Sequence, residues 1–375
     1  MVMNLFIGVS LLLAMLAFLL LRKSAKPARA RPASSPLPAA QHAPVITKPV
    51  REPDATAVPV VLPPALAAFR FVLEDELNDA YKQAMVAKLR HISKPAPSLH
   101  QFVSEYFMTW ATTKELTDLV VSNPLLTAKV LATVNSPFYG LQMPVHSMGQ
   151  AITFLGFNTV RTIGLRYIMS DTVKSGSIEL TGVFDTIWTA SAIACELCLK
   201  LAQKLKLPDQ GVLATHMVLS FIGQLASCSL MPEQISSATA NHGLLGRSES
   251  EQAQLGLASA EIGGLLMREW GLPEVIIDDV RDIDHVLVTP VQAMDTQRGT
   301  RMALCYLCAR LGERLAQGSL SNLAQFDLTD EQDMDLFCLR SYLQTPALAR
   351  LAEHLYSSDV LAAVARMQES IPGRM

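Results

Sequence analysis

Two pairs of cysteines have the C-x-x-C spacing that binds metal or carries redox chemistry in many proteins. Cys195 and Cys198 form one pair, and Cys305 and Cys308 form the other. Two such pairs can together hold a zinc ion. Here each pair lies in an apolar helical pattern without the turn residues of a zinc knuckle, and free cysteines are often buried. The pattern therefore favours packing in a core over a zinc site or a redox pair, and the six cysteines suit a reducing cytoplasm.

A histidine and several carboxylates offer a second candidate set of ligands. His216 could combine with Asp185, or with Asp284 and His285, because imidazole and carboxylate together suit divalent metals and can activate a bound water. The alternative is that His216 is a partly buried helix residue bonded to backbone or solvent. Asp284 and His285 would then mark the polar end of a helix, and we favour this second interpretation.

The elements that must position these residues are helices. Half of the 375 residues are hydrophobic and only 6% are aromatic, with few alternating runs of Val, Ile and Thr. Composition and periodicity therefore predict an all-α fold. Seven of the 31 basic residues lie between Arg22 and Arg51 with no acid among them, which leaves 24 basic against 34 acidic residues from Glu52 onward. An acidic folded part argues against nucleic acid as a partner.

The sequence from Leu119 to Gly164 predicts two short helices with clear ends. Asn123 can cap the first helix, with Pro124 at its first position, where a missing N–H costs nothing. The cluster Asn135–Gly140 breaks this helix. Its apolar positions, at three- and four-residue spacing, are Leu126, Val130, Leu131 and Val134.

The second helix begins with a different cap. Ser147 and Gln150 have the S-x-x-Q spacing of a capping box, in which each side chain bonds the backbone N–H of the other residue. Gly156 then interrupts the apolar pattern before it resumes. The apolar residues on either side are Ala151, Ile152, Leu155, Val160 and Ile163.

Together these residues resemble the HDOD family, the HD-related output domain of bacterial signalling proteins. Asn123 stands where the family usually has aspartate, which keeps the helix cap and removes a charge. The resemblance extends from about Pro95 to about His285 and implies an HD-like helical domain. The matching motif positions are Asn123, Pro124, Asn135, Ser136, Gly140, Leu155 and Gly156.

Catalytic members of the wider HD superfamily bind divalent metal through histidines and aspartates, and the resemblance implies that this chain has lost those positions. Ala190 stands where the family's W-x-H-S helix has its histidine, and Ser220 and Phe221 replace the His-Asp pair. Ser259 stands where another histidine is often found. Alanine and phenylalanine cannot bind a metal, so we expect no HD hydrolase site and no cofactor. The flanking residues that keep the motif are Trp188 and Gly223.

The first 21 residues predict a membrane anchor. Leu5 to Leu21 is uncharged and mostly aliphatic, and at about 1.5 Å per residue it comes close to spanning a hydrocarbon core of about 30 Å. A cleaved signal peptide is the alternative, but such peptides carry positive charge before the apolar run, and none is present here. The basic residues that follow predict a single-pass protein of the bacterial inner membrane with its C-terminal side in the cytoplasm.

Composition and periodicity divide the remainder of the chain. Residues 22–64 hold 10 of the 21 prolines, which predicts a basic, disordered tether. Helical spacing from Ala65 to about His91 predicts an amphipathic helix that packs on the domain or pairs with another chain. Helical patterns also occur at 301–317, 327–345 and 346–368. The expected organisation is an anchor at 1–21, a tether at 22–64, an amphipathic helix at 65–94, an HDOD domain at 95–289 and a C-terminal helical subdomain at 290–375.

The resemblance and the lost ligands together predict a membrane-tethered, non-catalytic signalling or regulatory module. Its output would pass through a signalling protein or a small ligand that contacts the surface around the lost site and the Asn135–Gly140 loop. Phe221 indicates that side chains fill the lost site.

Two alternatives come from other functional classes. One is a divergent metal-dependent phosphohydrolase with relocated ligands around His216, Asp284 and His285. The other is a membrane-organising scaffold that self-associates through the Leu5–Leu21 segment or the Ala65–His91 helix.

Overall fold

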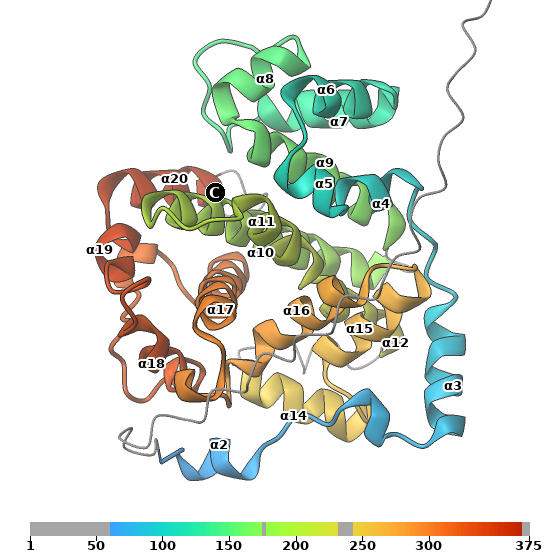
Figure 1. Cartoon of the computed structure of the whole chain (residues 1–375), viewed down its shortest axis with the longest axis vertical. Coiled ribbons are helices and arrows are strands. Elements are labelled where there is room, and N and C mark those ends of the chain that lie inside the picture. Colours follow the sequence, from blue (N-terminus) through green and yellow to red (C-terminus); the bar gives the residue numbers. More distant parts are fainter. Residues whose placement is uncertain (1–60, 175–177, 232–242, 370–375) are drawn as a thin grey trace, which may run out of the picture. The chain divides into compact units, whose positions relative to one another are not determined.

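Every regular element that the structure describes is a helix, which confirms the all-α prediction for this part of the chain (Figure 1). The computed structural model describes residues 61–174, 178–231 and 243–369. All of these described residues belong to one compact unit, within 53–375. The predicted membrane anchor lies outside the described residues, as does the predicted tether up to residue 60.

Residues 64–89 form two separate helices rather than one. α2 (Pro64–Ala68) and α3 (Asp79–Leu89) are separated by an extended stretch and the 3₁₀ turn η1 (Glu74–Glu76). The predicted continuous amphipathic helix from Ala65 to about His91 is therefore wrong. The reason is tertiary, because side chains of the later domain bond the backbone between the two helices.

In the segment from Leu119 to Gly164, helices begin and break at the predicted residues, but Gly156 divides the predicted second helix into two separate helices. The side chain of Asn123 accepts hydrogen bonds from two backbone N–H groups of the first turn, and α7 begins at Pro124. Gly156, with φ of +85°, separates α8 from α9 in a conformation that favours glycine. The helices of this half are α4 (Ser98–Phe102), α5 (Glu105–Thr109), α6 (Thr113–Val121), α7 (Pro124–Val134), α8 (Met148–Leu155) and α9 (Phe157–Thr172).

The predicted capping box at the start of α8 is only half formed. The hydroxyl of Ser147 accepts a hydrogen bond from the Gln150 N–H at 3.2 Å, as predicted. The side chain of Gln150 accepts from the N–H of His146, at 2.8 Å, instead of the N–H of Ser147. The glutamine therefore satisfies a donor one residue further out than the capping box requires.

Two long helices lie at the centre of the domain. α10 (Ile178–Lys204) and α17 (Thr296–Gln317) pack along each other. They approach closely because Gly312 has no side chain: a Cβ at this position would lie 2.4 Å from the carbonyl oxygen of Ala190. The helices between them in the sequence are α11 (Gln210–Leu219), α12 (Ile222–Leu230), α14 (Leu244–Leu255), α15 (Ser259–Glu269) and α16 (Glu274–His285).

The last 80 or so described residues complete this core rather than forming a subdomain of their own, since α17 packs inside the same unit. The predicted helix at 327–345 is largely irregular. Asp327, Asp330 and Asp333 each accept a hydrogen bond from the backbone N–H two residues further on, a local arrangement that competes with helix. The short elements here are η4 (Met334–Leu336), α18 (Leu339–Leu343), α19 (Leu351–Leu355) and α20 (Ser358–Glu369).

Two helical stretches of the domain are long and apolar enough to cross a membrane. They are 181–204, within α10, and 210–230, which includes α11 and α12. Most of their residues are buried inside the unit. Core helices of this length satisfy the same test, so the finding is weak evidence for membrane insertion.

Candidate functional site

The position of the lost histidine at 190 lies inside the crossing of α10 and α17. Ala190 is buried, and its carbonyl oxygen lies against the backbone of Gly312. The Cβ of Ala194, one turn further along α10, would lie 2.9 Å from a Cβ at 312. Small residues on both helices therefore let the two backbones approach closely at position 190.

The two positions of the lost His-Asp pair lie at the junction between α11 and α12. Ser220 is the last residue before the junction, and its hydroxyl donates to the carbonyl oxygen of Met217 at 2.9 Å. Phe221 is only 2% exposed and belongs to the apolar core. Neither side chain offers a metal ligand here, because one is bonded locally and the other is hydrocarbon.

The fourth position, Ser259, closes a tight contact between α12 and α15. A Cβ at Gly223 would lie 1.9 Å from the carbonyl oxygen of Ser259, so only glycine fits this approach. The carboxylate of Glu251 accepts a hydrogen bond from the Ser259 N–H at 2.7 Å. Between them, Gly256 turns the chain with φ of +73°. The retained motif residues therefore serve packing and helix capping.

The structure does not bring the alternative ligand set together. Asp284 pairs with Arg310, at 3.3 Å, and His285 lies 3.7 Å from Glu261. Asp185 lies on a cleft that none of these residues lines. Among the described residues, no group of three or more His, Cys, Asp and Glu side chains is placed to hold a metal ion.

His216 is buried beside a carboxylate that is already paired. Its Nε2 atom lies 3.9 Å from Asp279, which itself contacts Arg298 at 3.1 Å and Arg301 at 3.7 Å. Burial lowers the pKa of His216 to about 4, against a partial opposing effect of Asp279. The imidazole is therefore neutral at pH 7. His216 is a helix residue, as predicted, but the prediction that it is partly buried and bonded to backbone or solvent is wrong: it is 1% exposed, and its Nδ1 atom has no hydrogen-bond partner.

The C-x-x-C cysteines face one another across the α10–α17 contact. Cys198 lies within hydrogen-bonding reach of Cys305 and Cys308, and all four thiols are buried. Burial raises the pKa of Cys195 to about 12, which keeps this thiol protonated and a poor nucleophile or ligand. These facts agree with the predicted packing role.

Sequence reasoning missed a fully buried arginine beside a small pocket. The guanidinium of Arg161 donates to the carbonyl oxygens of Phe102 and Gly211 and to the hydroxyl of Thr215. Burial lowers its pKa to about 10, so it stays charged at pH 7. It thereby ties α9 to α11 and to the end of α4. The only signal in the sequence is a charged residue between the core residues at 160 and 163.

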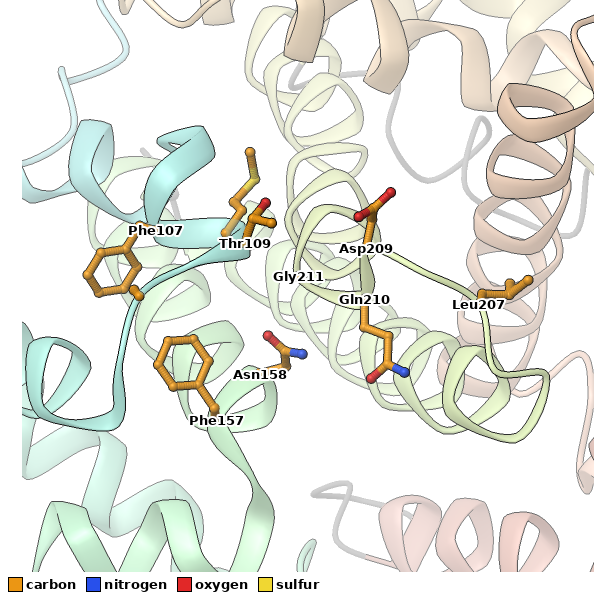
Figure 2. A pocket seen from close by; sticks show the side chains of 10 residues that line it. Phe107, Thr109, Phe157, Asn158, Leu207, Asp209, Gln210 and Gly211 are labelled. Atoms are coloured by element: carbon orange, nitrogen blue, oxygen red, sulfur yellow. The ribbon is translucent and has the colours of Figure 1, made fainter.

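The small pocket lies where the loop before α11 meets α5 and α9 (Figure 2). Its volume is about 310 Å³. Gly211 forms part of its wall, and a Cβ there would lie 2.1 Å from the carbonyl oxygen of Met108. Lys206 and Asp209 in the adjoining loop have φ of 54° and 58°, an uncommon conformation for residues other than glycine. The labelled side chains that line it include Phe107, Thr109, Phe157, Asn158, Asp209 and Gln210.

The larger cleft, of about 1030 Å³, lies along α10 and reaches α7, α9, α17 and α20. Its walls mix charge and aromatic surface. Lys129 and Asp185 are exposed in it and form no ion pair with another described residue, while Arg166 donates to the carbonyl oxygen of Trp188 at 2.9 Å. Trp188 is half-buried. Further lining residues include Thr133, Ser136, Phe138, Thr186 and Thr189.

The Asn135–Gly140 loop forms one wall of this cleft, and Asn135 holds it in place. The Asn135 side chain donates to the carbonyl oxygen of Val145 at 2.8 Å and accepts from the N–H of the same residue at 2.7 Å. Ser136 donates to the carbonyl oxygen of Thr133. Gly140, with φ of +60°, lies against the side chain of Arg366 on α20. Asn135 thus holds the loop in position through hydrogen bonds to the backbone of Val145, and Ser136 lines the cleft.

Comparisons with known proteins agree with this architecture. The family model described as HDOD domain matches residues 97–286. A crystal structure of an HDOD domain protein of unknown function from Geobacter sulfurreducens is 16% identical, with a TM-score of 0.54 over 77% of this chain and 99% of that one. A phosphohydrolase candidate from Shewanella amazonensis is 18% identical, with a TM-score of 0.49 over 76% and 97% of the two chains. No curated protein sequence matches this chain.

Proposed function

We propose, on the premise that this chain belongs to the HDOD family, that it is a non-catalytic signalling module that acts by binding. The observation that carries the proposal is the state of the four positions where catalytic relatives in the HD superfamily hold metal. Ala190, Ser220, Phe221 and Ser259 lie in helix contacts, local hydrogen bonds or apolar core. An HD hydrolase needs a metal to activate water, and these side chains supply no ligand set for one.

The binding surface in this proposal is the cleft along α7, α10 and the Asn135–Gly140 loop. Its volume of about 1030 Å³ is at the upper end of ordinary ligand sites, and its open walls also suit a segment of a protein. Lys129 and Asp185 supply opposite charges for orienting a partner, and Trp188 supplies the large aromatic surface that often dominates binding energy. The favoured partner is another signalling protein.

Membrane attachment is part of the same proposal. The apolar run Leu5–Leu21 and the basic residues that follow it would hold the domain at the cytoplasmic face of the bacterial inner membrane. A domain tethered in this way meets membrane-bound partners at a raised local concentration.

The test is a crosslinking pull-down from native membranes with the full-length chain as bait. We expect a specific signalling protein to be enriched with the wild type and lost with the double substitution Lys129→Glu and Trp188→Ala. Val275→Ala is the matched control, because Val275 is 74% exposed on α16, away from the cleft. Equal enrichment with the double variant and the wild type would exclude the cleft as the binding surface.

A divergent hydrolase is the competing function, and the buried His216 beside Asp279 is the feature that favours it. The purified chain would then carry near-stoichiometric metal and hydrolyse nucleotides or phosphodiesters, and both would be lost in His216→Gln. Metal analysis and a hydrolysis assay decide the matter. Metal-dependent turnover would refute the non-catalytic proposal.

A further inference from the structure

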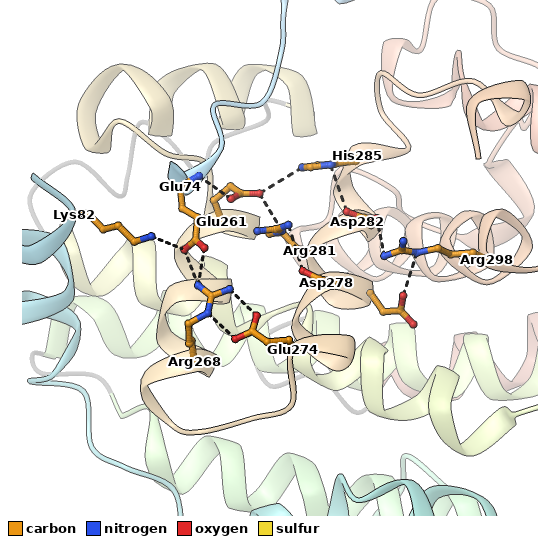
Figure 3. Close-up of polar contacts among 11 residues, drawn as sticks. Glu74, Lys82, Glu261, Arg268, Glu274, Asp278, Arg281, Asp282, His285 and Arg298 are labelled. Atoms are coloured by element: carbon orange, nitrogen blue, oxygen red, sulfur yellow. Dashed lines mark hydrogen bonds and ion pairs between the residues drawn. The ribbon is translucent and has the colours of Figure 1, made fainter. Parts of the chain in front are cut away.

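A short extended arm of the chain, residues 69–74, is bound to α14, α15 and α16 in the way that a protein binds a peptide. The arm follows α2 and ends at Glu74, the first residue of η1. It makes contacts of three kinds with the domain, which involve its backbone, an aromatic side chain and a carboxylate. Figure 3 shows the contacts of Glu74 with Glu261, Arg268 and Lys82.

The backbone of the arm is held by side chains. Gln252 of α14 uses both ends of its amide: its Oε1 accepts from the N–H of Val72 at 2.8 Å, and its Nε2 donates to the carbonyl oxygen of Arg70 at 3.1 Å. The buried carboxylate of Glu261, on α15, accepts from the N–H of Glu74 at 3.2 Å. Hydrogen bonds to the backbone fix the register of an extended segment without depending on its sequence.

The aromatic contact is specific to one position. Phe71 is 6% exposed, and its ring stacks on the imidazole of His285 with a centroid distance of 4.6 Å and an interplanar angle of 23°. The ring of Phe69 packs edge-on against the ring of Phe71, with a centroid distance of 5.0 Å. A buried aromatic side chain of this kind is the usual anchor of a bound peptide.

The carboxylate contact lies three residues further on. Both oxygens of Glu74 are 2.7 Å from Nη1 of Arg268 on α15, and Arg268 also binds Glu274 at 2.8 Å. Lys82 approaches the Glu74 carboxylate at 3.7 Å. Glu74 is mostly buried, so the pair is worth more than an exposed ion pair.

We propose that the surface formed by Gln252, Glu261, Arg268 and His285 is a recognition site for an extended peptide with an aromatic residue and, three positions later, a carboxylate, and that residues 69–74 occupy it in cis. The occupant that the structure assigns is the chain's own arm. A partner segment with the same pattern would bind by displacing it. Because the arm follows the segment at 22–64, its displacement would change how the domain is connected to its N-terminal region.

This inference goes beyond the proposed function and does not depend on it. The peptide site lies on α14–α16 and shares no residue with the cleft. Lys129→Glu should therefore leave peptide binding unchanged, so a failure of one proposal leaves the other standing.

The test uses the full chain and a labelled synthetic peptide of residues 66–78. In the wild type the attached arm competes at an effective concentration on the order of millimolar, so the free peptide should bind poorly. With Phe71→Ala and Glu74→Gln in the chain, we expect the peptide to bind at least about tenfold more tightly by fluorescence anisotropy. Adding Gln252→Ala and Arg268→Ala should abolish that gain, and a peptide carrying the Phe71→Ala and Glu74→Gln changes should not bind.

Folding is checked separately, so that a damaged variant cannot decide the result. Circular dichroism must show the same helix content in each chain. If the double variant fails to fold, hydrogen exchange on Glu74→Gln alone replaces it: exchange at 69–76 should accelerate while α10 stays protected. Arg70→Ala is the matched control. The Arg70 side chain forms an ion pair with Glu76 and, among the described residues, none with α14, α15 or α16. A folded double variant that does not bind the peptide, or unchanged exchange in Glu74→Gln, would overturn the inference.

Discussion

The two sides of α10 differ in what they contact. On one side, Ala190 and Ala194 lie against Gly312 of α17, with no room for another carbon atom. On the other side, Asp185, Trp188 and Thr189 line an open cleft of about 1030 Å³. Ala190 is thus two positions from Trp188, the aromatic side chain of the proposed binding surface. The same helix has a filled side that gives stability and an open side that is available for contacts.

This difference fits the proposal that the domain keeps its fold without an HD metal site. Replacing a polar ligand by alanine or phenylalanine allows apolar packing, and buried apolar surface stabilises the folded state. On the cleft side, Lys129 and Asp185 are exposed and add little to that packing. Substitutions on the filled side should therefore change the free energy of unfolding strongly, whereas those on the cleft side should change binding.

The largest expected effect is at Phe221. Phe221→Ala removes a nearly fully buried aromatic side chain and should lower the free energy of unfolding by roughly 3–5 kcal/mol, measured by urea denaturation. Phe221→Leu is the control, since it keeps most of the buried hydrocarbon and should cost much less.

The reverse substitution tests whether the lost site can still work. Ser220→His with Phe221→Asp restores the His-Asp pair but buries a carboxylate in apolar core, which should also destabilise the domain. We expect no stoichiometric metal in this variant. Metal binding with retained stability would show that the junction of α11 and α12 is a latent metal site.

A pair of glycines on the two sides gives the next largest contrast. Gly312→Ala places a Cβ 2.4 Å from the carbonyl oxygen of Ala190, which should cost about 3 kcal/mol through overpacking. Gly182→Ala, on the cleft side of α10, has no neighbouring atom within 4 Å and should stabilise the helix by up to about 1 kcal/mol. Both are measured by urea denaturation, and effects of the same sign would contradict the comparison.

His216 adds a pH-dependent test of the filled region. Its pKa is about 4 in the folded chain, against 6.5 ordinarily, so the folded state binds fewer protons between these values. The stability contributed above pH 6.5 is lost as the pH falls toward 4. Between pH 7 and pH 4.5 we expect the wild type to lose roughly 2 kcal/mol more than His216→Gln.

The comparison with the variant is needed because Glu261 titrates with the opposite sign. Burial raises the pKa of Glu261 to about 7, so its contribution to stability falls as the pH rises toward 7. Glu261 is present in both chains, and its contribution cancels in the difference. Equal pH dependence of the two chains would show that His216 is not held neutral by burial.

Sequence predicted the elements with local signals and missed those set by tertiary contacts. The cap at Asn123 and the break at Gly156 depend on neighbouring residues alone, and both are as predicted. The arm at 69–74 has a helical apolar spacing, but Gln252 and Glu261 hold its backbone extended. Those two partners lie about 180 residues away in the sequence, so a local pattern could not reveal them.

The candidate site could be predicted only in part for the same reason. Motif spacing located Ser136 and Trp188, which line the cleft, because a motif is a local pattern. Lys129, Arg166 and Asp185 come from three different helices, and only the fold brings them to one surface. The close approach of the two backbones at position 190 depends on Gly312, which lies more than 100 residues later in the sequence. The family resemblance does not extend to that region.

The smallest expected effect on stability comes from the cleft side. Lys129 is exposed and forms no ion pair with another described residue, so Lys129→Glu should change the free energy of unfolding by no more than about 0.5 kcal/mol. The same change reverses a charge on the cleft wall, and reversed charges slow association and disfavour a complementary partner. Binding of the partner should therefore weaken, with a steeper loss at low salt, while urea denaturation is unchanged. If Lys129→Glu destabilised the chain as much as Phe221→Ala, the cleft wall would be structural, and its proposed role as a binding surface would fail.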